Sequence, residues 1–316
     1  MHWIELVLGL IAMLLGAKWL VDGTVRLSHR LGFSEFIVSV VVIGIGTCTP
    51  ELFVSVISGA RDLGTLVLSN NVASNIINIF GVLGIGALIS PIIVGGERHT
   101  SDVVFMLIAS VALTVLVMFG TIGFWGGMAL FGILFAYLWH ARRESGNNRM
   151  PPARRAVSIK GARDGAIWKM LILIIIGILA IYVGSEVFIN SLDFIADAYD
   201  LDQTISGILI VGPGTAIPEL LVTIIAALRR RPQIAVGNIV GSNLMNIVLV
   251  ISTGAVIIDL PVSAHIAYFD IWVMGAATLI MCYDVLVRGK ISRATGAMYI
   301  GLLALYLWAA VVVPLA

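Results

Sequence analysis

Runs of about twenty apolar residues recur along this chain, and they constrain its fold more than any other feature. A hydrocarbon core about 30 Å thick is crossed by roughly 20 apolar residues in a helix. Only 12% of the 316 residues are charged and 59% are apolar, whereas water-soluble domains average about 25% charged residues. We therefore predict an all-α integral membrane protein and exclude a water-soluble enzyme.

The apolar runs predict ten transmembrane helices. The first run lacks a basic n-region and a small-residue cleavage site, so we expect a retained helix rather than a signal peptide. The stretch 102–141 must turn tightly near Gly120 to hold two spans, and a nine-span chain is the alternative. The predicted spans are 3–23, 36–58, 66–93, 102–120, 122–141, 168–190, 204–228, 233–258, 267–287 and 294–315.

Basic residues predict the orientation of these spans, because Lys and Arg accumulate in short cytoplasmic loops. With the N-terminus outside, 17 of the 19 basic residues fall in the predicted inside loops. The basic, proline-containing segment 142–167 is then a cytoplasmic linker between a first five-helix repeat, 1–141, and a second, 168–316. We expect a multi-pass protein of the plasma membrane, with the lipid bilayer as its surroundings.

Composition and residue placement weaken several other function classes. A net charge of +1 indicates no nucleic-acid partner, and two cysteines support neither a disulfide framework nor a multi-cysteine metal site. All five histidines fall at span ends or in loops, so an intramembrane hydrolase has little support. We expect no enzyme activity and no cofactor, and the oligomeric state stays open. Asp102, Asp270 and Asp284 lie at span ends and are expected at the membrane interface.

An internal repeat with an offset of 168 residues relates the two halves. GIGTCTPELFVS at 44–55 matches GPGTAIPELLVT at 212–223, and NNVASNIIN at 70–78 matches NIVGSNLMN at 238–246. The loop before the first motif is basic, whereas its counterpart at 191–203 holds four aspartates and no basic residue. The copies therefore face opposite sides of the membrane, which favours five spans per half. Inverted repeats with interrupted helices are typical of secondary transporters.

The first motif of each copy combines a helix break with a carboxylate. Pro50 and Pro218 each remove a backbone donor and are expected to break their helices, leaving unpaired carbonyls near 44–47 and 212–215. Free carbonyls at membrane depth are tolerated where they line a cavity or bind a ligand. A hard cation such as calcium accepts backbone carbonyls and carboxylates together. The motif therefore predicts a cation site near the middle of the membrane.

Glu51 and Glu219 follow these breaks, at a depth where an ionised carboxylate costs several kcal/mol unless it is paired. No basic residue is placed to pair with them, because Lys18 lies near the cytoplasmic end of the first span. A divalent cation, two monovalent cations or protons can each neutralise the two carboxylates. These are the occupants that an exchange cycle requires.

The second motif of each copy repeats serine and asparagine at a spacing of four, which places both on one helix face. Ser74 and Asn78, and likewise Ser242 and Asn246, can complete coordination shells with hydroxyl and amide oxygens. Bonding between helices is the alternative role of such residues. The same choice stays open for four further asparagines, Asn70, Asn75, Asn238 and Asn243.

These paired motifs resemble those of the calcium/cation antiporter superfamily, in the branch of the sodium/calcium exchangers, whose repeats run approximately G-T-S-x-P-E and then G-S-N-x-x-N or D. The resemblance implies ten helices in two inverted repeats, and alternating access by sliding of the first and sixth helices. It implies calcium ligation by Thr47, Glu51, Thr215 and Glu219. It also implies coupling-ion positions at Gly44, Ser74, Asn78, Gly212, Ser242 and Asn246.

Three departures from the family pattern concern the coupling ion. Cys48 and Ala216 stand where the family motif has serine, and Asn246 stands where many prokaryotic members have aspartate. A thiol is a poor ligand for sodium and a methyl group is none. The sequence thus predicts an antiporter that exchanges calcium for sodium, with proton coupling in the same fold as the alternative. A channel is disfavoured by the inverted repeat and the interrupted helices.

Overall fold

The computed structural model describes residues 2–31, 38–48, 51–52, 55–56, 64–94, 100–144, 167–198 and 216–312, which are almost entirely helical. The predicted all-α membrane fold is confirmed. Seven helices in these ranges are long and apolar enough to cross a membrane, and Ile217–Leu228 is a shorter apolar helix. The predicted spans 36–58 and 204–228 lie partly outside the described residues, so the count of ten stays a prediction.

The described elements of the first half are helices separated by short strands and π-helical turns (η). They are α1 (His2–Leu31), η1 (Ser39–Ile43), α3 (Gly44–Thr47), α5 (Gly64–Ile77), η2 (Asn78–Leu83), α6 (Gly84–Ile89), β1 (Ile92–Ile93), α7 (Thr100–Val117), β2 (Thr121–Ile122) and α8 (Phe124–Glu144).

The second half follows the same order. Its described elements are α10 (Ile167–Ala198), α13 (Ile217–Leu228), α14 (Pro232–Met245), η4 (Asn246–Ile251), α15 (Ser252–Ile257), β3 (Leu260–Pro261), η5 (Ile266–Asp270), α16 (Ile271–Leu286), β4 (Lys290–Ile291) and α17 (Arg293–Val312).

The sequence offset of 168 residues is also an offset between structural elements. Adding 168 to the bounds of η2, α6 and β1 gives the bounds of η4, α15 and β3. The strands pair across the halves: β1 is antiparallel to β4, and β2 is antiparallel to β3. Each half therefore supplies one partner to each of these two-stranded sheets.

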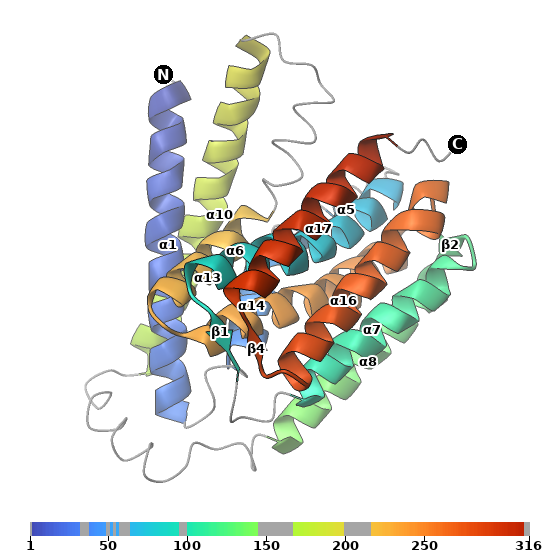
Figure 1. Cartoon of the computed structure of the whole chain (residues 1–316), viewed down its shortest axis with the longest axis horizontal. Helices are drawn as coiled ribbons and strands as arrows, with labels where there is room; N and C mark the ends of the chain where they lie inside the picture. Colours follow the sequence, from blue (N-terminus) through green and yellow to red (C-terminus); the bar gives the residue numbers. More distant parts are fainter. Residues whose placement is uncertain are drawn as a thin grey trace.

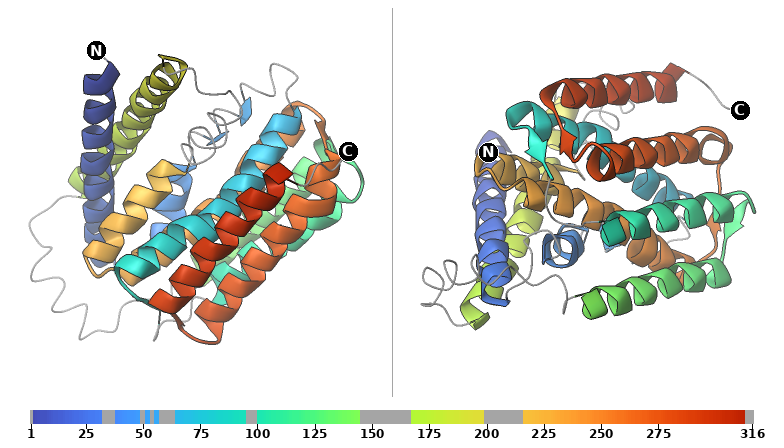
Figure 2. Two further views of the ribbon diagram at one scale, coloured as in Figure 1. Left: turned by 45° about the horizontal axis from the view of Figure 1, so that its top comes forward. Right: turned by 60° about the horizontal axis from the view of Figure 1, so that its bottom comes forward.

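Glycine contacts between α1 and α10 show that the repeat is inverted. Gly9 packs against Gly184, and Gly16 packs against Gly177, so the two helices are antiparallel. A Cβ atom at Gly16 would lie 2.7 Å from the carbonyl oxygen of Gly177, so the close approach requires glycine. Under the offset, Gly9 corresponds to Gly177 and Gly16 to Gly184, so each helix packs on its own counterpart. Figures 1 and 2 show this helix pair set apart from the other long helices, with α13 contacting both members.

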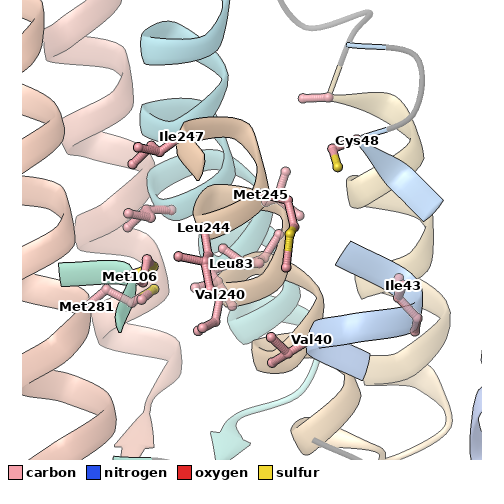
Figure 3. Packing of buried hydrophobic residues seen from close by; sticks show 14 of the residues in the cluster. Val40, Ile43, Cys48, Leu83, Met106, Val240, Leu244, Met245, Ile247 and Met281 are labelled. Atoms are coloured by element: carbon pink, nitrogen blue, oxygen red, sulfur yellow. The ribbon is translucent and has the colours of Figure 1, made fainter. Parts of the chain in front are cut away.

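Helix α14 and its continuation form the centre of the protein. Within an 18-residue apolar stretch of the span Pro232–Ile257, 94% of the residues are buried, whereas the figure is 22% for Phe124–Ala141 on the periphery. Figure 3 shows Val240 and Leu244 of α14 among apolar side chains that include Met106 and Met281. A helix that is apolar all round and buried inside a bundle can carry polar side chains only where they are satisfied or functional.

The turn that divides 102–141 into two helices is confirmed. Helix α7 ends at Val117 and α8 begins at Phe124. Between them Gly120 has a φ of +79°, in the left-handed region where a Cβ atom is strained. The apolar faces of α8 and α10 remain exposed, for example at Trp125 and Ile175, as expected for helices that face lipid.

Three aspartates expected at the membrane interface have their carboxylates buried in protein. Tyrosine hydroxyls donate hydrogen bonds to all three: Tyr137 to Asp102 at 2.9 Å, Tyr306 to Asp270 at 3.0 Å, and Tyr299 to Asp284 at 2.8 Å. Position at a span end does not reveal this burial, because the neighbouring helices determine it. The bonds join α7 to α8, η5 to α17 and α16 to α17. They therefore fix these outer helices to one another.

Replacing Tyr299 by phenylalanine should therefore destabilise the protein. The buried carboxylate of Asp284 would lose its hydroxyl donor, which costs about 1–3 kcal/mol. Thermal unfolding in detergent measures the effect, and Tyr283→Phe, which removes an exposed hydroxyl from α16, is the matched control. Equal melting temperatures for the two variants would contradict this account of Asp284.

Candidate cation-binding site

In the second repeat, the structure confirms a helix start immediately before the glutamate. Ala216 is the N-cap residue of α13, Pro218 lies in the first turn, and Glu219 follows it. Proline is well tolerated there because its missing N–H has no helical acceptor to serve. The predicted site residues Gly212 and Thr215 lie outside the described residues.

In the first repeat, fewer carbonyls around the predicted helix break are unpaired than the sequence had suggested. The backbone N–H of Cys48 donates to the carbonyl of Gly44 at 3.2 Å, and that of Leu52 donates to the carbonyl of Cys48 at 3.0 Å. The prediction of an unpaired carbonyl at Gly44 is therefore wrong, because the helical bond forms before the break. Pro50 itself lies outside the described residues, but it has no N–H, so Gly46 lacks the donor four residues on.

The two glutamates are almost fully buried and mostly unpaired. Glu51 is 2% exposed and Glu219 is 1% exposed. Oε2 of Glu51 and both carboxylate oxygens of Glu219 have no hydrogen-bond partner, and no Lys, Arg or His in the described ranges pairs with either side chain. The carboxylates lie within range of one another's charge. Two such charges in a low-dielectric interior require a compensating positive charge.

A hydroxyl pair from opposite repeats lies beside Glu219. Thr47 Oγ1 is 2.9 Å from Ser242 Oγ and also donates to the carbonyl of Ile43 at 3.1 Å. Both hydroxyls lie near the Glu219 carboxylate, although neither makes a hydrogen bond to it. The structure thus brings together three of the predicted site residues, from α3, α13 and α14.

The predicted asparagines Asn78 and Asn246 each begin a π-turn, η2 and η4. Such turns interrupt the regular helical register and are frequent at functional sites. The two side chains are at most 1% exposed, and Oδ1 of each has no hydrogen-bond partner. Ser74 is buried one turn before Asn78, as the spacing predicted.

Sequence spacing had left Asn75 and Asn243 undecided between ion contact and bonding between helices, and the structure shows the second. Nδ2 of Asn243 donates to the carbonyl of Asn75 at 3.1 Å, and Nδ2 of Asn75 lies 3.4 Å from the carbonyl of Asn243. The two residues are counterparts under the offset, so the bonds are reciprocal across the repeats.

One asparagine of the first repeat was matched to the wrong counterpart. Asn238 donates to Thr223 Oγ1 at 3.1 Å, and the equivalent bond in the first repeat joins Asn71, not Asn70, to Ser55 Oγ at 3.5 Å. Asn71 is fully buried, whereas Asn70 is half-buried. The sequence did contain a signal for this bond, because its acceptors Ser55 and Thr223 are separated by the repeat offset. Aligning the two repeats without a gap matched Asn70 to Asn238 and so concealed the role of Asn71.

A narrow crevice lies where the helix pair α1 and α10 meets α3 and α13. Its lining is mostly apolar and includes Thr47 and Pro218. The lining residues are Leu20, Gly46, Thr47, Ile178, Ile181, Tyr182 and Pro218.

The donor set suits a hard cation. Among the described residues, no three His, Cys, Asp or Glu side chains gather in a group. The atoms available are carboxylate, amide and hydroxyl oxygens, which are the ligands of calcium and sodium rather than of zinc or copper. The sequence profile of the sodium/calcium exchanger protein family matches residues 1–142 and 169–312, most of the chain.

The chain belongs to the sodium/calcium exchanger family. Its relatives include an uncharacterized membrane protein of Methanocaldococcus jannaschii, MJ0091, with 31% identity over 80% of this chain and 81% of the relative. The sodium/calcium exchanger MaX1 of Methanosarcina acetivorans is 26% identical over 93% of this chain and 94% of its own length. The solved structure of the sodium/calcium exchanger from Methanococcus jannaschii superposes with a TM-score of 0.83 at 28% identity, covering 99% of both chains.

Membership in this family establishes the protein as a multi-pass membrane antiporter that exchanges cations, in the calcium/cation antiporter superfamily. A transporter moves its ions without chemically changing them. The identity of the coupling ion and the roles of the individual site residues are matters for the proposal below.

Proposed function

We propose that this exchanger moves calcium across the membrane in exchange for sodium, and that it holds calcium between Glu51 and Glu219. The observation that carries the proposal is the burial of both carboxylates with three oxygens unpaired. Carboxylates in that state are stable only when a cation or protons occupy the site with them.

The charge of the site accounts for exchange. One calcium ion or two sodium ions each neutralise two carboxylates, so either occupant makes the site uncharged. An empty site would leave two unpaired charges in a low-dielectric interior, and that state is strongly disfavoured. The protein would therefore return across its cycle with one occupant or the other, which is the requirement for coupled antiport.

We assign the remaining predicted residues to two groups. Thr47 and Thr215 would complete the calcium shell beside the glutamates. The coupling-ion positions would draw on Gly44, Ser74, Asn78, Gly212, Ser242 and Asn246. Support for the second group is strongest at Asn78 and Asn246, whose amide oxygens are buried and unpartnered, and weakest at Gly44, whose carbonyl already accepts a helical bond.

Alternating access would come from movement of α1 and α10 as a pair. The two helices pack on one another through glycines, expose large apolar faces and meet the remaining bundle along η1, α3 and α13. The crevice lined by Thr47 and Pro218 lies along this junction. Sliding of the pair would open or close that path without breaking the hydrogen bonds of the central helices.

We also propose the orientation that the charges predict. The exchanger would lie in the plasma membrane with its N-terminus outside and segment 142–167 as a cytoplasmic linker between the repeats 1–141 and 168–316. The asymmetry of Lys and Arg between predicted loops supports this orientation.

Proton coupling is a second candidate, favoured by the residues that replace the family's serines. Cys48 is fully buried, and its thiol is directed to the carbonyl of Ile45 at 3.5 Å. Ala216, at the N-cap of α13, offers no side-chain oxygen. With Asn246 in place of aspartate, these positions supply fewer ligands for sodium and leave protons as the competing occupants of Glu51 and Glu219.

Calcium uptake by proteoliposomes should follow an outward sodium gradient. Sodium-loaded vesicles diluted into sodium-free calcium buffer should accumulate calcium, and vesicles with sodium on both sides should not. A calcium-sensitive dye reports the uptake. If a pH gradient alone drives uptake in the complete absence of sodium, coupling belongs to protons and the sodium assignment is wrong.

Glu51→Gln and Glu219→Gln should each abolish exchange. Each substitution removes one of two charges that bind calcium, and we expect at least about a 100-fold fall in initial rate, equivalent to about 2.7 kcal/mol. Asp259→Asn, which neutralises an exposed carboxylate, is the matched control and should retain the rate. Normal transport by either glutamate variant would place the site elsewhere.

The double variant Cys48→Ser with Ala216→Ser should strengthen sodium dependence. The two added hydroxyl oxygens restore sodium ligands. The sodium concentration that gives half-maximal exchange should therefore fall by about threefold to tenfold, a change in binding free energy close to that of one net hydrogen bond. Cys282→Ser, a thiol replacement on α16, controls for loss of a cysteine. An unchanged sodium dependence would show that these positions do not limit sodium binding.

A further inference from the structure

Four buried asparagines meet where the central helices of the two repeats cross. Asn75 and Asn78 come from α5 and η2, and Asn243 and Asn246 come from α14 and η4. All four are at most 2% exposed. The family resemblance and the proposed function use only Asn78 and Asn246, so the role of the other two is unassigned.

The orientation of the Asn243 side chain is fixed by a backbone group. Its Nδ2 lies 3.1 Å from the carbonyl oxygen of Asn75, which can only accept a hydrogen bond. The amide of Asn243 must therefore turn its NH2 group to that carbonyl and its Oδ1 to the opposite side. That Oδ1 accepts a hydrogen bond from Nδ2 of Asn78 at 3.1 Å.

The mirror arrangement holds in the other repeat. Nδ2 of Asn75 faces the carbonyl oxygen of Asn243 at 3.4 Å, with Met274 Sδ at 3.8 Å as a second, weak acceptor. Oδ1 of Asn75 then accepts a hydrogen bond from Nδ2 of Asn246 at 3.1 Å. Each repeat thus orients an asparagine of the other repeat.

These bonds decide which end of two further amides is available. An amide group is planar, so an NH2 group held at one edge leaves the carbonyl oxygen at the other edge. Oδ1 of Asn78 and Oδ1 of Asn246 are the atoms left buried and without a partner. A 180° flip of either amide would set two carbonyl oxygens against each other at the bonded edge, so the orientation is enforced.

The unpartnered oxygens lie on the helix face that carries the site. Asn246 follows Ser242 by one helical turn, and Ser242 contacts Thr47 and lies beside Glu219. Asn78 stands in the same relation to Ser74. An amide that presented its NH2 group on this face would repel a cation, whereas a carbonyl oxygen attracts one.

We propose that Asn75 and Asn243 are positioning residues, which hold the amides of Asn78 and Asn246 so that carbonyl oxygens, and not NH2 groups, face the transported cations. The inference rests on the proposed function, since it concerns the same site. It goes further in assigning to Asn75 and Asn243 an effect on cation affinity that acts through Asn78 and Asn246. It also means that the orientation of the amide ligand in each repeat is determined by an asparagine of the opposite repeat.

Two double-mutant cycles test the proposal through the calcium concentration for half-maximal exchange. Asn243→Ala should raise that concentration about tenfold with less change in the maximal rate, because the Asn78 amide is then free to flip. The effect should vanish in an Asn78→Ala background, where no amide remains to be positioned. In an Asn246→Ala background the same Asn243→Ala effect should persist in full, because Asn243 does not touch Asn246.

The mirror cycle gives an independent measurement if one variant fails to fold. Asn75→Ala should raise the half-maximal concentration, lose its effect with Asn246→Ala, and keep it with Asn78→Ala. Asn190→Ala, which removes an exposed amide from α10, is the control for generic loss of asparagine. A purely structural role would multiply the effects in all backgrounds alike, and that result would overturn the proposal.

The outcomes separate this inference from the proposed function. If Glu51→Gln still exchanges calcium, the site lies elsewhere and both are overturned. If Glu51→Gln is inactive while all cycles are multiplicative, the site stands and only the positioning role of Asn75 and Asn243 is overturned.

Discussion

Two carboxylates without basic partners inside a membrane protein impose a requirement on everything around them. Glu51 and Glu219 cannot both remain ionised in this interior unless positive charge accompanies them. The two glutamates come from opposite repeats, and the surrounding hydroxyl and amide oxygens offer lone pairs. Because no basic side chain of the described residues pairs with them, a bound cation or protons must neutralise these carboxylates. In the proposed cycle, binding of a transported cation therefore also stabilises the site.

The inverted repeat supplies the geometry for that site. A pseudo-two-fold relation places Asn75 against its counterpart Asn243, and Ser110 within 3.5 Å of its counterpart Thr278. Contacts between counterparts of this kind occur only along the symmetry axis. The polar residues near this axis lie between helices that are buried on all sides. The glycine-packed pair α1 and α10 forms a layer beside these helices.

Much of this arrangement could be predicted from the letters alone, because the relevant signals are strong. Apolar runs gave the helices, the duplicated motif gave the repeat, and Pro218 marked the start of α13 correctly. Other features depend on neighbours that are distant in sequence. The burial of Asp284 and the pairing of Asn71 with Ser55 follow from helix packing, whereas the Gly44 carbonyl accepts a local helical bond from the N–H of Cys48. The π-turns at Asn78 and Asn246 have no local sequence signature, and they shift the register by an amount that periodicity cannot reveal.

The exchanged strand pairs have a consequence for how the chain is made. β1 and β2 belong to the first half, yet their hydrogen-bond partners β4 and β3 lie at Lys290–Ile291 and Leu260–Pro261. A ribosome must therefore synthesise the chain as far as β3 before β2 can pair and as far as β4 before β1 can pair. The amides of Asn75 and Asn78 likewise find their acceptors only after Asn243 has been made. Until then the strands β1 and β2 of the first half lack their hydrogen-bond partners. Its completion is an assembly event between two membrane-inserted halves, which makes the order of insertion part of the folding problem.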